Sequence, residues 1–206
     1  MERTSPGPPL AGIRVLELGS SVSGPFAGRL LADLGAEVIK IEPLEGDQLR
    51  TWGTQASDGS SWWFKSHNRG KRLLAFDLRD GRAIATLKAI LRRCDVLLEN
   101  FRPGRLAEWG LGYEALRAEQ PGLIYVSISG YGQDGPYASR PGYGNVAESM
   151  GGLRFLSGFA DRPPVRMGIS LGDQVAALYA VIGTLAALQA RARDGLGDYV
   201  DVALTE

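Results

Sequence analysis

The strongest chemical feature of the sequence is a carboxylate at the start of a long apolar segment. Asp173 stands in "GISLGDQVAALY", and apolar residues continue through "AVIGTLAALQA". Asp is among the preferred capping residues and a glycine precedes it, so one hypothesis is that Asp173 only caps a helix. The other is that Asp173 is a nucleophile, because a helix N-terminus holds a carboxylate ionised and in a fixed position. The two roles are compatible.

The chain has one histidine and one cysteine, which limits the other chemistry open to it. A Ser-His-Asp or Cys-His relay would have to use His67, which lies in the cationic stretch "KSHNRGKR" that we interpret as a solvated loop. His67 and Cys94 supply too few preferred ligands for zinc, so we predict no metal site. Acid–base or nucleophilic chemistry must therefore depend mostly on carboxylates.

Glycines and arginines in predicted loops are the candidates for holding an anionic ligand. Gly19, Gly24 and Gly28 follow the first predicted strand, but their spacing differs from the fingerprint G-x-G-x-x-G. We interpret this loop as a tight turn whose helix N-terminus could hold a phosphate. Arg102 follows another predicted strand, where open α/β sheets bind ligands, and a guanidinium suits phosphate or carboxylate. A further basic cluster, solvated in the simpler interpretation, is Arg69, Lys71 and Arg72.

Alternating strands and helices must position these groups. Short apolar runs predict strands at 13–18, 36–42, 72–78, 95–100 and 123–129 and from residue 199. Helical signals predict helices from 25 to 34, over 81–94 after an Asp80 cap, at 105–110, 113–119 and 146–150, and from 174 to about 193. This order predicts an α/β fold with an open, mostly parallel Rossmann-like sheet and helices on both faces. The last helix is apolar on nearly all sides, so we expect it to be buried.

Composition excludes several classes of protein. The 206 residues carry 23 basic and 23 acidic side chains, so the net charge of zero argues against nucleic-acid binding. The N-terminus lacks the pattern of a signal peptide, and Gln189, Arg191 and Arg193 end the longest apolar run, so we predict no membrane span. A single cysteine fits a reducing, cytoplasmic location. Residues 1–9 are rich in Pro and predict a disordered leader, followed by one large domain over 10–206.

Several blocks of the sequence resemble the class III coenzyme A transferases, also called the CaiB/BaiF family. The blocks are "LAGIRVLELGSSVSGPFAGRLLADLGAEVIKIEPLEGDQLR", "NRGKR", "ENFRPG", "YVSISGYGQDGPYASRPGY" and "GISLGDQVAALYAVIGTLAALQARARDGLGDYVDVAL". They occur in consecutive order from about residue 10 to the last residue. Asp173 falls on the catalytic aspartate of the family.

The resemblance implies transfer of CoA from an acyl-CoA to a small carboxylic acid through aspartyl-anhydride and aspartyl-CoA thioester intermediates. It implies no tightly bound cofactor, since CoA is a substrate. By position it assigns CoA binding to Val22, Ser23, Asn68, Arg69, Lys71, Arg72 and Arg102. It places Tyr143 near the reacting thioester and Gly172 in the substrate pocket, and backbone N–H groups of residues 168–172 could stabilise anionic intermediates.

Departures from the family pattern keep alternatives open. Related racemases resemble this chain but carry a histidine where it has Tyr143, which disfavours racemisation. Gly144 replaces a common acidic residue, and Pro43 replaces a basic one. The resemblance implies that family chains continue into a second, smaller domain, so we expect this sequence to be a truncated N-terminal portion. We expect a homodimer, or complementation by a chain that supplies the C-terminal part. A non-catalytic acyl-CoA-binding remnant and a generic nucleotide-binding module are the remaining alternatives.

Overall fold

One sheet of six parallel strands forms the centre of the protein, and the computed structural model describes residues 7–205. The strand order is β3-β2-β1-β4-β5-β6, and every neighbouring pair is parallel. The strands are β1 (Arg14–Leu18), β2 (Glu37–Glu42), β3 (Arg72–Ala75), β4 (Val96–Glu99), β5 (Ile124–Ser129) and β6 (Tyr199–Ala203). This is the strand order of a Rossmann fold, so the predicted fold class is confirmed.

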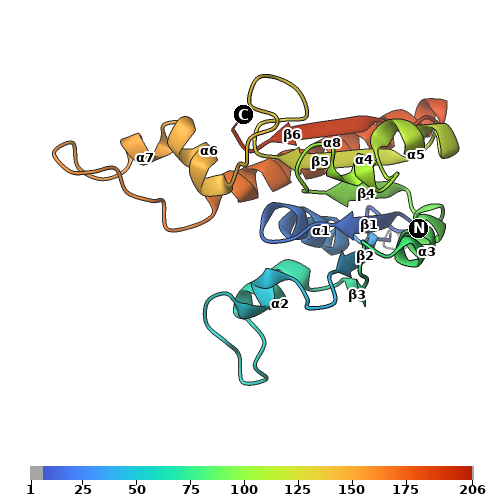
Figure 1. Cartoon of the computed structure of the whole chain (residues 1–206), viewed down its shortest axis with the longest axis horizontal. Coiled ribbons are helices and arrows are strands. Elements are labelled where there is room, and N and C mark those ends of the chain that lie inside the picture. Colours follow the sequence, from blue (N-terminus) through green and yellow to red (C-terminus); the bar gives the residue numbers. More distant parts are fainter. Residues whose placement is uncertain (1–6, 206) are drawn as a thin grey trace, which may run out of the picture.

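Helices cover both faces of the sheet, as predicted (Figure 1). One face packs against α1 (Ser23–Asp33) and α8 (Leu171–Asp194) through Ala27, Leu31 and Ala177. The other face packs against α3 (Gly81–Leu91), α4 (Arg105–Glu108) and α5 (Tyr113–Glu119). Strands β4 and β5 are buried along their whole length, which explains their unbroken apolar sequences.

The order of the strands reverses between β1 and β4, and this determines where a ligand fits. The chain moves outward from β1 to β2 and β3, then returns to place β4 on the other side of β1. The loops at the carboxyl ends of β1 and β4 therefore diverge and leave a crevice, which is the binding place in open α/β sheets. Helix α6 (Gly144–Met150) lies on the side to which the strand arrows point, and α7 (Leu153–Leu156) follows it (Figure 1).

Helix α8 differs from its prediction in both start and burial. It begins at Leu171 rather than Gln174, and only its inner face is buried, through residues such as Ala176 and Ala180. Its outer face exposes Leu178, Tyr179 and other apolar side chains, so the expectation of burial on all sides was wrong. By length and composition alone this helix could cross a membrane, contrary to our estimate from the apolar run. Its contacts with α1, β5 and β6 instead identify it as a helix packed on a sheet.

The segment around His67 is helical, which corrects the prediction of a solvated loop. Helix α2 (Trp62–Asn68) has Ser61 as its N-cap, and the short 3₁₀ helix η1 (Gln48–Thr51) precedes it. His67 is 5% exposed and stacks on Trp63, and burial lowers its pKa. The imidazole is therefore a packed side chain of this helix.

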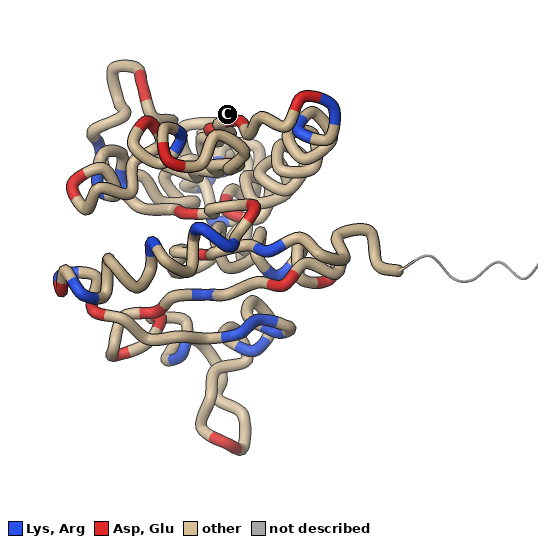
Figure 2. The backbone as a smooth tube through the Cα atoms, turned by 90° about the vertical axis from the view of Figure 1, so that its right-hand side faces the viewer, with Lys and Arg blue, Asp and Glu red and all other residues tan. Residues whose placement is uncertain are grey.

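The beginning of the chain and the distribution of charge complete the description. Residues 1–6 of the predicted leader lie outside the described residues. Residues 7–9, predicted to be disordered with them, instead lead into a turn in which Ala11 N donates to Pro8 O. Acidic and basic residues are interspersed along the described chain (Figure 2), in agreement with its zero net charge.

Candidate functional site

The loop after β1 is tightly bound to the end of β4 at the point where the sheet reverses. Asn100 accepts from Ser20 N at 2.9 Å and donates through Nδ2 to Ser20 O and Ser23 Oγ. A Cβ on Gly24 would lie 2.9 Å from Gly19 Cα and 3.1 Å from Asn100 Cγ. Gly19 and Gly24 are therefore required for close backbone approach, although they do not form the dinucleotide fingerprint.

A buried group of four charged side chains contacts the same loop at Gly19. Lys40 Nζ lies 3.1 Å from Glu17 Oε1 and 2.9 Å from Asp47 Oδ2, and it also donates to Gly19 O. Lys71 Nζ lies 2.7 Å from Glu17 Oε2. Burial alone would lower the pKa of Lys40, but the charges of Glu17 and Asp47 outweigh burial and raise it. Burial lowers the pKa of Lys71 to about 8. Two cations and two anions thus compensate one another inside the protein.

A cavity of about 260 Å³ lies over the carboxyl ends of β1, β4 and β5, and Asp173 lines it. We call it the Asp173 cavity. Its wall includes Ser20, Ser21, Ser23, Gln48, Arg102, Ser129, Arg140 and Tyr143. A Cβ on Gly130 would meet Gly142 Cα at 2.5 Å, so two glycines bring the 140–143 segment against the end of β5. The Ser129 hydroxyl is buried without a hydrogen-bond partner among the described residues.

Asp173 lies in the first turn of α8 and is not its cap. Ser170 occupies the N-cap position and makes no side-chain capping bond. The carboxylate lies against the start of α6, where a Cβ on Gly144 would be 2.1 Å from Asp173 Oδ2. Burial, and after it the charge of Glu148, raises the pKa of Asp173 to about 6. The capping hypothesis was therefore wrong, and the environment holds the proton more tightly than we predicted.

Glu148, on α6, is the charged group that contributes to the raised pKa of Asp173. Its side chain is 2% exposed, and Oε1 accepts from Gly172 N at 3.3 Å. Its other oxygen is buried without a hydrogen-bond partner among residues 7–205. The Gly172 N–H that we expected to face a substrate is thus engaged within the protein. Two carboxylates lie together at the start of α8.

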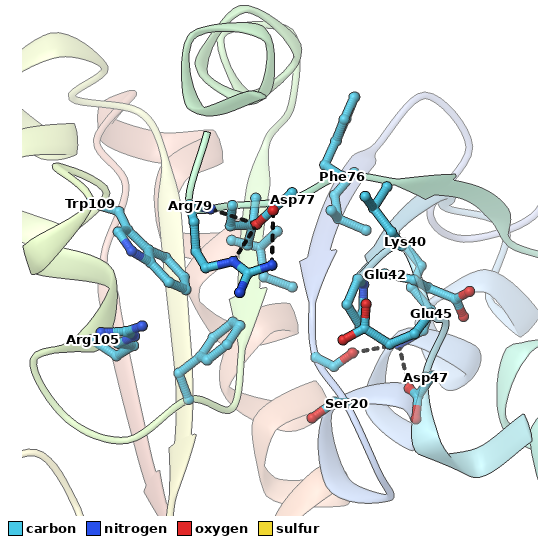
Figure 3. Close-up of a pocket in the computed structure, with 17 residues that line it drawn as sticks. Ser20, Lys40, Glu42, Glu45, Asp47, Phe76, Asp77, Arg79, Arg105 and Trp109 are labelled. Carbon is cyan, nitrogen blue, oxygen red and sulfur yellow. Dashed lines mark hydrogen bonds and ion pairs between the residues drawn. The ribbon is translucent and has the colours of Figure 1, made fainter. Parts of the chain in front are cut away.

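A second cavity, of about 300 Å³, adjoins the first along the carboxyl edge of the sheet. We call it the Arg79 cavity, and Ser20 and Phe101 line both cavities. Figure 3 shows Arg79 between Trp109 on one side and the Glu42–Asp47 segment on the other. The wall also includes Leu44, Phe76, Leu78 and Arg105. Arg79 donates to Asp77 at 2.8 and 2.9 Å, and Arg105 pairs with Glu108. Unlike Arg69 and Arg72, both line a cavity, and aromatic and aliphatic surface beside two arginines is suited to a ligand with a flat ring and phosphate groups.

Comparison with known sequences agrees with this geometry. A sequence model described as CoA-transferase family III matches residues 10–206. The chain belongs to this family. The succinyl-CoA–D-citramalate CoA-transferase of Chloroflexus aurantiacus is 49% identical over 100% of this chain and 52% of its own length. The succinate–glutarate CoA-transferase of Agrobacterium fabrum is 42% identical over 97% of this chain and 52% of its own.

Solved structures of the family have the same fold. A CaiB/BaiF family protein from Brucella suis superimposes with a TM-score of 0.91 at 43% identity, covering 96% of this chain and 53% of that protein. The chain spans about half the length of the curated relatives it matches. The predicted family and fold are therefore confirmed.

In this family III chain, the predicted site residues divide into two groups. Ser23, Arg102 and Tyr143 line the Asp173 cavity together with Asp173 itself. Val22 lies beside them in sequence but is 3% exposed and packs with Leu49 and Phe64. Gly172 is adjacent to Asp173, and its N–H donates to Glu148.

The structure does not bring Asn68, Arg69, Lys71 or Arg72 to either cavity. Arg72 pairs with Ile39 in the sheet register and bonds Glu37 at the start of β2, which is the amino edge. Arg69 bonds Asp33 at the end of α1. Asn68 Oδ1 accepts from the buried Lys71, which is bound to Glu17. These side chains form contacts within the protein. A basic run that precedes a parallel strand lies at the amino edge of the sheet, opposite the carboxyl edge where both cavities lie.

Sequence reasoning missed Arg79, Arg105, Trp109, Gln48, Arg140 and Glu148. Arg79 was accessible to inference, because it follows the strand run "RLLAFDL" and loops after strands lie at the binding edge. Glu148 had no such signal, since its position depends on how α6 packs against α8. Burial raises the pKa of Cys94 to about 11, so its thiol is not an activated nucleophile.

Proposed function

We propose that this chain carries the nucleophile and the CoA-binding surface of a CoA transferase, moving CoA from an acyl-CoA to a carboxylic acid. The observation that carries the proposal is the placement of Asp173 in a cavity over the strand ends, beside the cavity of Arg79. A carboxylate with a pKa near 6 is mostly ionised at neutral pH and more basic than an exposed one. It is therefore suited to attack a thioester.

The reaction proceeds in four balanced steps. The Asp173 carboxylate forms a C–O bond to the thioester carbonyl, and the C–S bond breaks to release CoA thiolate. The thiolate attacks the Asp173 carbonyl, which releases the donor acid and leaves an aspartyl-CoA thioester. The acceptor carboxylate attacks this thioester and expels the thiolate again. The thiolate then attacks the acyl carbonyl of the acceptor and restores Asp173, so electrons and protons balance without a further reactant.

The two cavities support one extended binding mode for acyl-CoA. The adenine ring would lie in the Arg79 cavity against Phe76 and Trp109, with Arg79 and Arg105 beside the phosphates. The pantetheine arm would pass Ser20, which lines both cavities, and bring the thioester to Asp173. This assignment replaces Arg69, Lys71 and Arg72 as the predicted CoA contacts. It keeps Ser23 and Arg102 at the thioester end.

A dicarboxylic acid is the proposed substrate class. Arg102 and Arg140 line the Asp173 cavity, so a second carboxylate of the acid would meet a cation there. The buried Ser129 hydroxyl offers a further donor at the end of β5. The relatives named for succinyl-CoA, citramalate and glutarate support this class.

Mass spectrometry separates transfer from racemisation. The full chain is incubated with succinyl-CoA and quenched in acid, and its intact mass is compared with that of Asp173→Ala. We expect a CoA-sized adduct on the native chain and none on the variant. A racemase forms no covalent adduct, and this chain has Tyr143 where the related racemases carry a histidine. An adduct that persists in Asp173→Ala would refute the assignment.

We also propose that further protein covers the outer face of α8 in the working enzyme, as a homodimer or through a complementing chain. Leu178, Tyr179 and Ile182 are all about half exposed or more, and Phe155 and Leu156 on α7 are more than 75% exposed. Apolar surface of this extent on one side marks an interface. Sedimentation velocity giving a soluble monomer at every concentration would contradict this.

A further inference from the structure

Helix α8 lacks the capping group that its first turn needs. The first N–H groups of a helix have no partner inside the helix, and a side chain at the N-cap commonly accepts from one of them. Ser170 occupies that position without a side-chain bond. Glu148 Oε1 on α6 instead accepts from Gly172 N at 3.3 Å. An acidic side chain from another helix therefore supplies the cap of α8.

Because Glu148 caps α8, the Asp173 carboxylate does not have to act as the cap of its own helix. Gly144 begins α6 one helical turn before Glu148, and the absence of a side chain there leaves room for Asp173 Oδ2. Gly172 also approaches closely, since its Cβ would lie 3.1 Å from Gly144 O. Helix α6 thus contacts Asp173 at its first residue, Gly144, and caps α8 one turn later through Glu148. Both features follow from "GYGNVAE".

We propose that Glu148 is a positioning residue for Asp173, capping α8 in its place and acting as a second buried carboxylate that keeps the nucleophile basic. This inference rests on the proposed function for its meaning in catalysis. Glu148 Oε2 has no hydrogen-bond partner among the described residues and is buried, so its charge is poorly screened. When Asp173 attacks a thioester its negative charge is lost, and the repulsion between the two carboxylates disappears with it. Acylation is favoured by that relief.

Among the charged groups on the surrounding elements, the Nε of Arg154 is buried without a hydrogen-bond partner in residues 7–205, and the others pair, accept a hydrogen bond or line the cavity. Burial and then Glu148 raise the pKa of Asp173, and no basic side chain contributes to the shift. The charged groups on the surrounding elements are Arg29 and Asp33 on α1, which pair with each other, Arg154 on α7, Asp201 on β6, which accepts from Gln133 N, and Arg102 and Arg140 in the cavity wall. The proton affinity of Asp173 should therefore depend on the charge of Glu148.

The test measures this coupling directly on the full chain. The side-chain carboxyl carbon of Asp173 is followed by ¹³C NMR between pH 3.5 and 8, in native protein, Glu148→Gln, and the control Glu114→Gln at an exposed position of α5. Glutamine keeps an oxygen for Gly172 N–H but removes the charge. We expect the Asp173 midpoint to fall so that its proton affinity drops about threefold or more in Glu148→Gln. The control should leave it unchanged.

A second variant keeps the inference falsifiable if Glu148→Gln does not fold. Glu148→Asp keeps a carboxylate but withdraws it by one methylene, so the Asp173 midpoint should fall below its native value. If the Asp173 midpoint moves in neither variant, the inference is overturned. The pH profile of adduct formation in Glu148→Gln should shift to lower pH with the NMR midpoint, which a merely structural role would not produce. Coupled titration without any adduct would instead refute the proposed function and leave the pair intact.

Discussion

Replacing Asp173 by Asn should stabilise the folded protein at neutral pH. Burial and Glu148 raise the pKa of Asp173 from 3.8 to about 6, so the folded state binds this proton more tightly than the unfolded state. The ionised carboxylate therefore costs stability above pH 6, less as the pH falls from 6 to 3.8, and nothing below that window. The full shift corresponds to about 3 kcal/mol, and solvent in the cavity reduces this to about 1–3 kcal/mol.

Urea unfolding of native protein and Asp173→Asn at pH 7.5 and 4.5 tests this, with the exposed Asp161→Asn as control. At pH 7.5 the free energy of unfolding of the variant should be higher by that amount, or Tm higher by about 2–4 °C per kcal/mol. At pH 4.5 the gain should shrink to about a third, because the folded carboxyl is then largely protonated while the unfolded one is still mostly ionised. A variant of equal or lower stability at pH 7.5, or a gain independent of pH, would refute the reasoning. The variant should form no CoA adduct.

Three further substitutions test the site and its support. Gly144→Ala adds a Cβ within 2.1 Å of Asp173 Oδ2, so we expect circular dichroism to stay native while adduct formation slows about a hundredfold. Lys40→Met leaves the buried Asp47 without its cation, and urea unfolding should show a loss of about 3–5 kcal/mol. Arg79→Ala should weaken CoA binding about tenfold by calorimetry, with a smaller effect at high salt; unchanged affinity would remove the Arg79 cavity from the binding mode.

The sheet was predictable because each strand has a recognisable pattern in its own short stretch of sequence. "VLLE" and "IYVSIS" are buried on both faces, so they are apolar without alternation and flanked by turn residues. Strand β3 is shorter than its prediction of 72–78, since it pairs only with β2 at the sheet edge and ends at Ala75. Apolar runs thus predict that a strand is present. Where the strand ends depends on the neighbouring strand with which it pairs, and the run itself holds no information on that strand.

The site was predictable where a residue follows a strand directly, as Arg102 follows β4, or where the resemblance to a family singled it out, as for Asp173 and Tyr143. These three residues reach one cavity. Asn68 and Arg72 lie away from both cavities because a basic segment precedes β3, and the start of a parallel strand lies at the opposite edge from the binding crevice. Glu148 was missed because it acts through contacts between α6 and α8. Such contacts between distant segments have no local signature.

The outer face of α8 explains why composition overestimated its burial. Apolar side chains recur there at helical spacing from Val175, at Leu178, Tyr179, Ile182 and Leu185, so they form one stripe along the helix. The inner stripe is made of small residues such as Ala176, Ala177 and Ala180, which allow close packing on the sheet. The helix therefore has apolar surface for two contacts, and the described residues supply one. Hydropathy measures how much surface is apolar and does not identify what packs against it, so it could not distinguish the packed inner stripe from the exposed outer stripe.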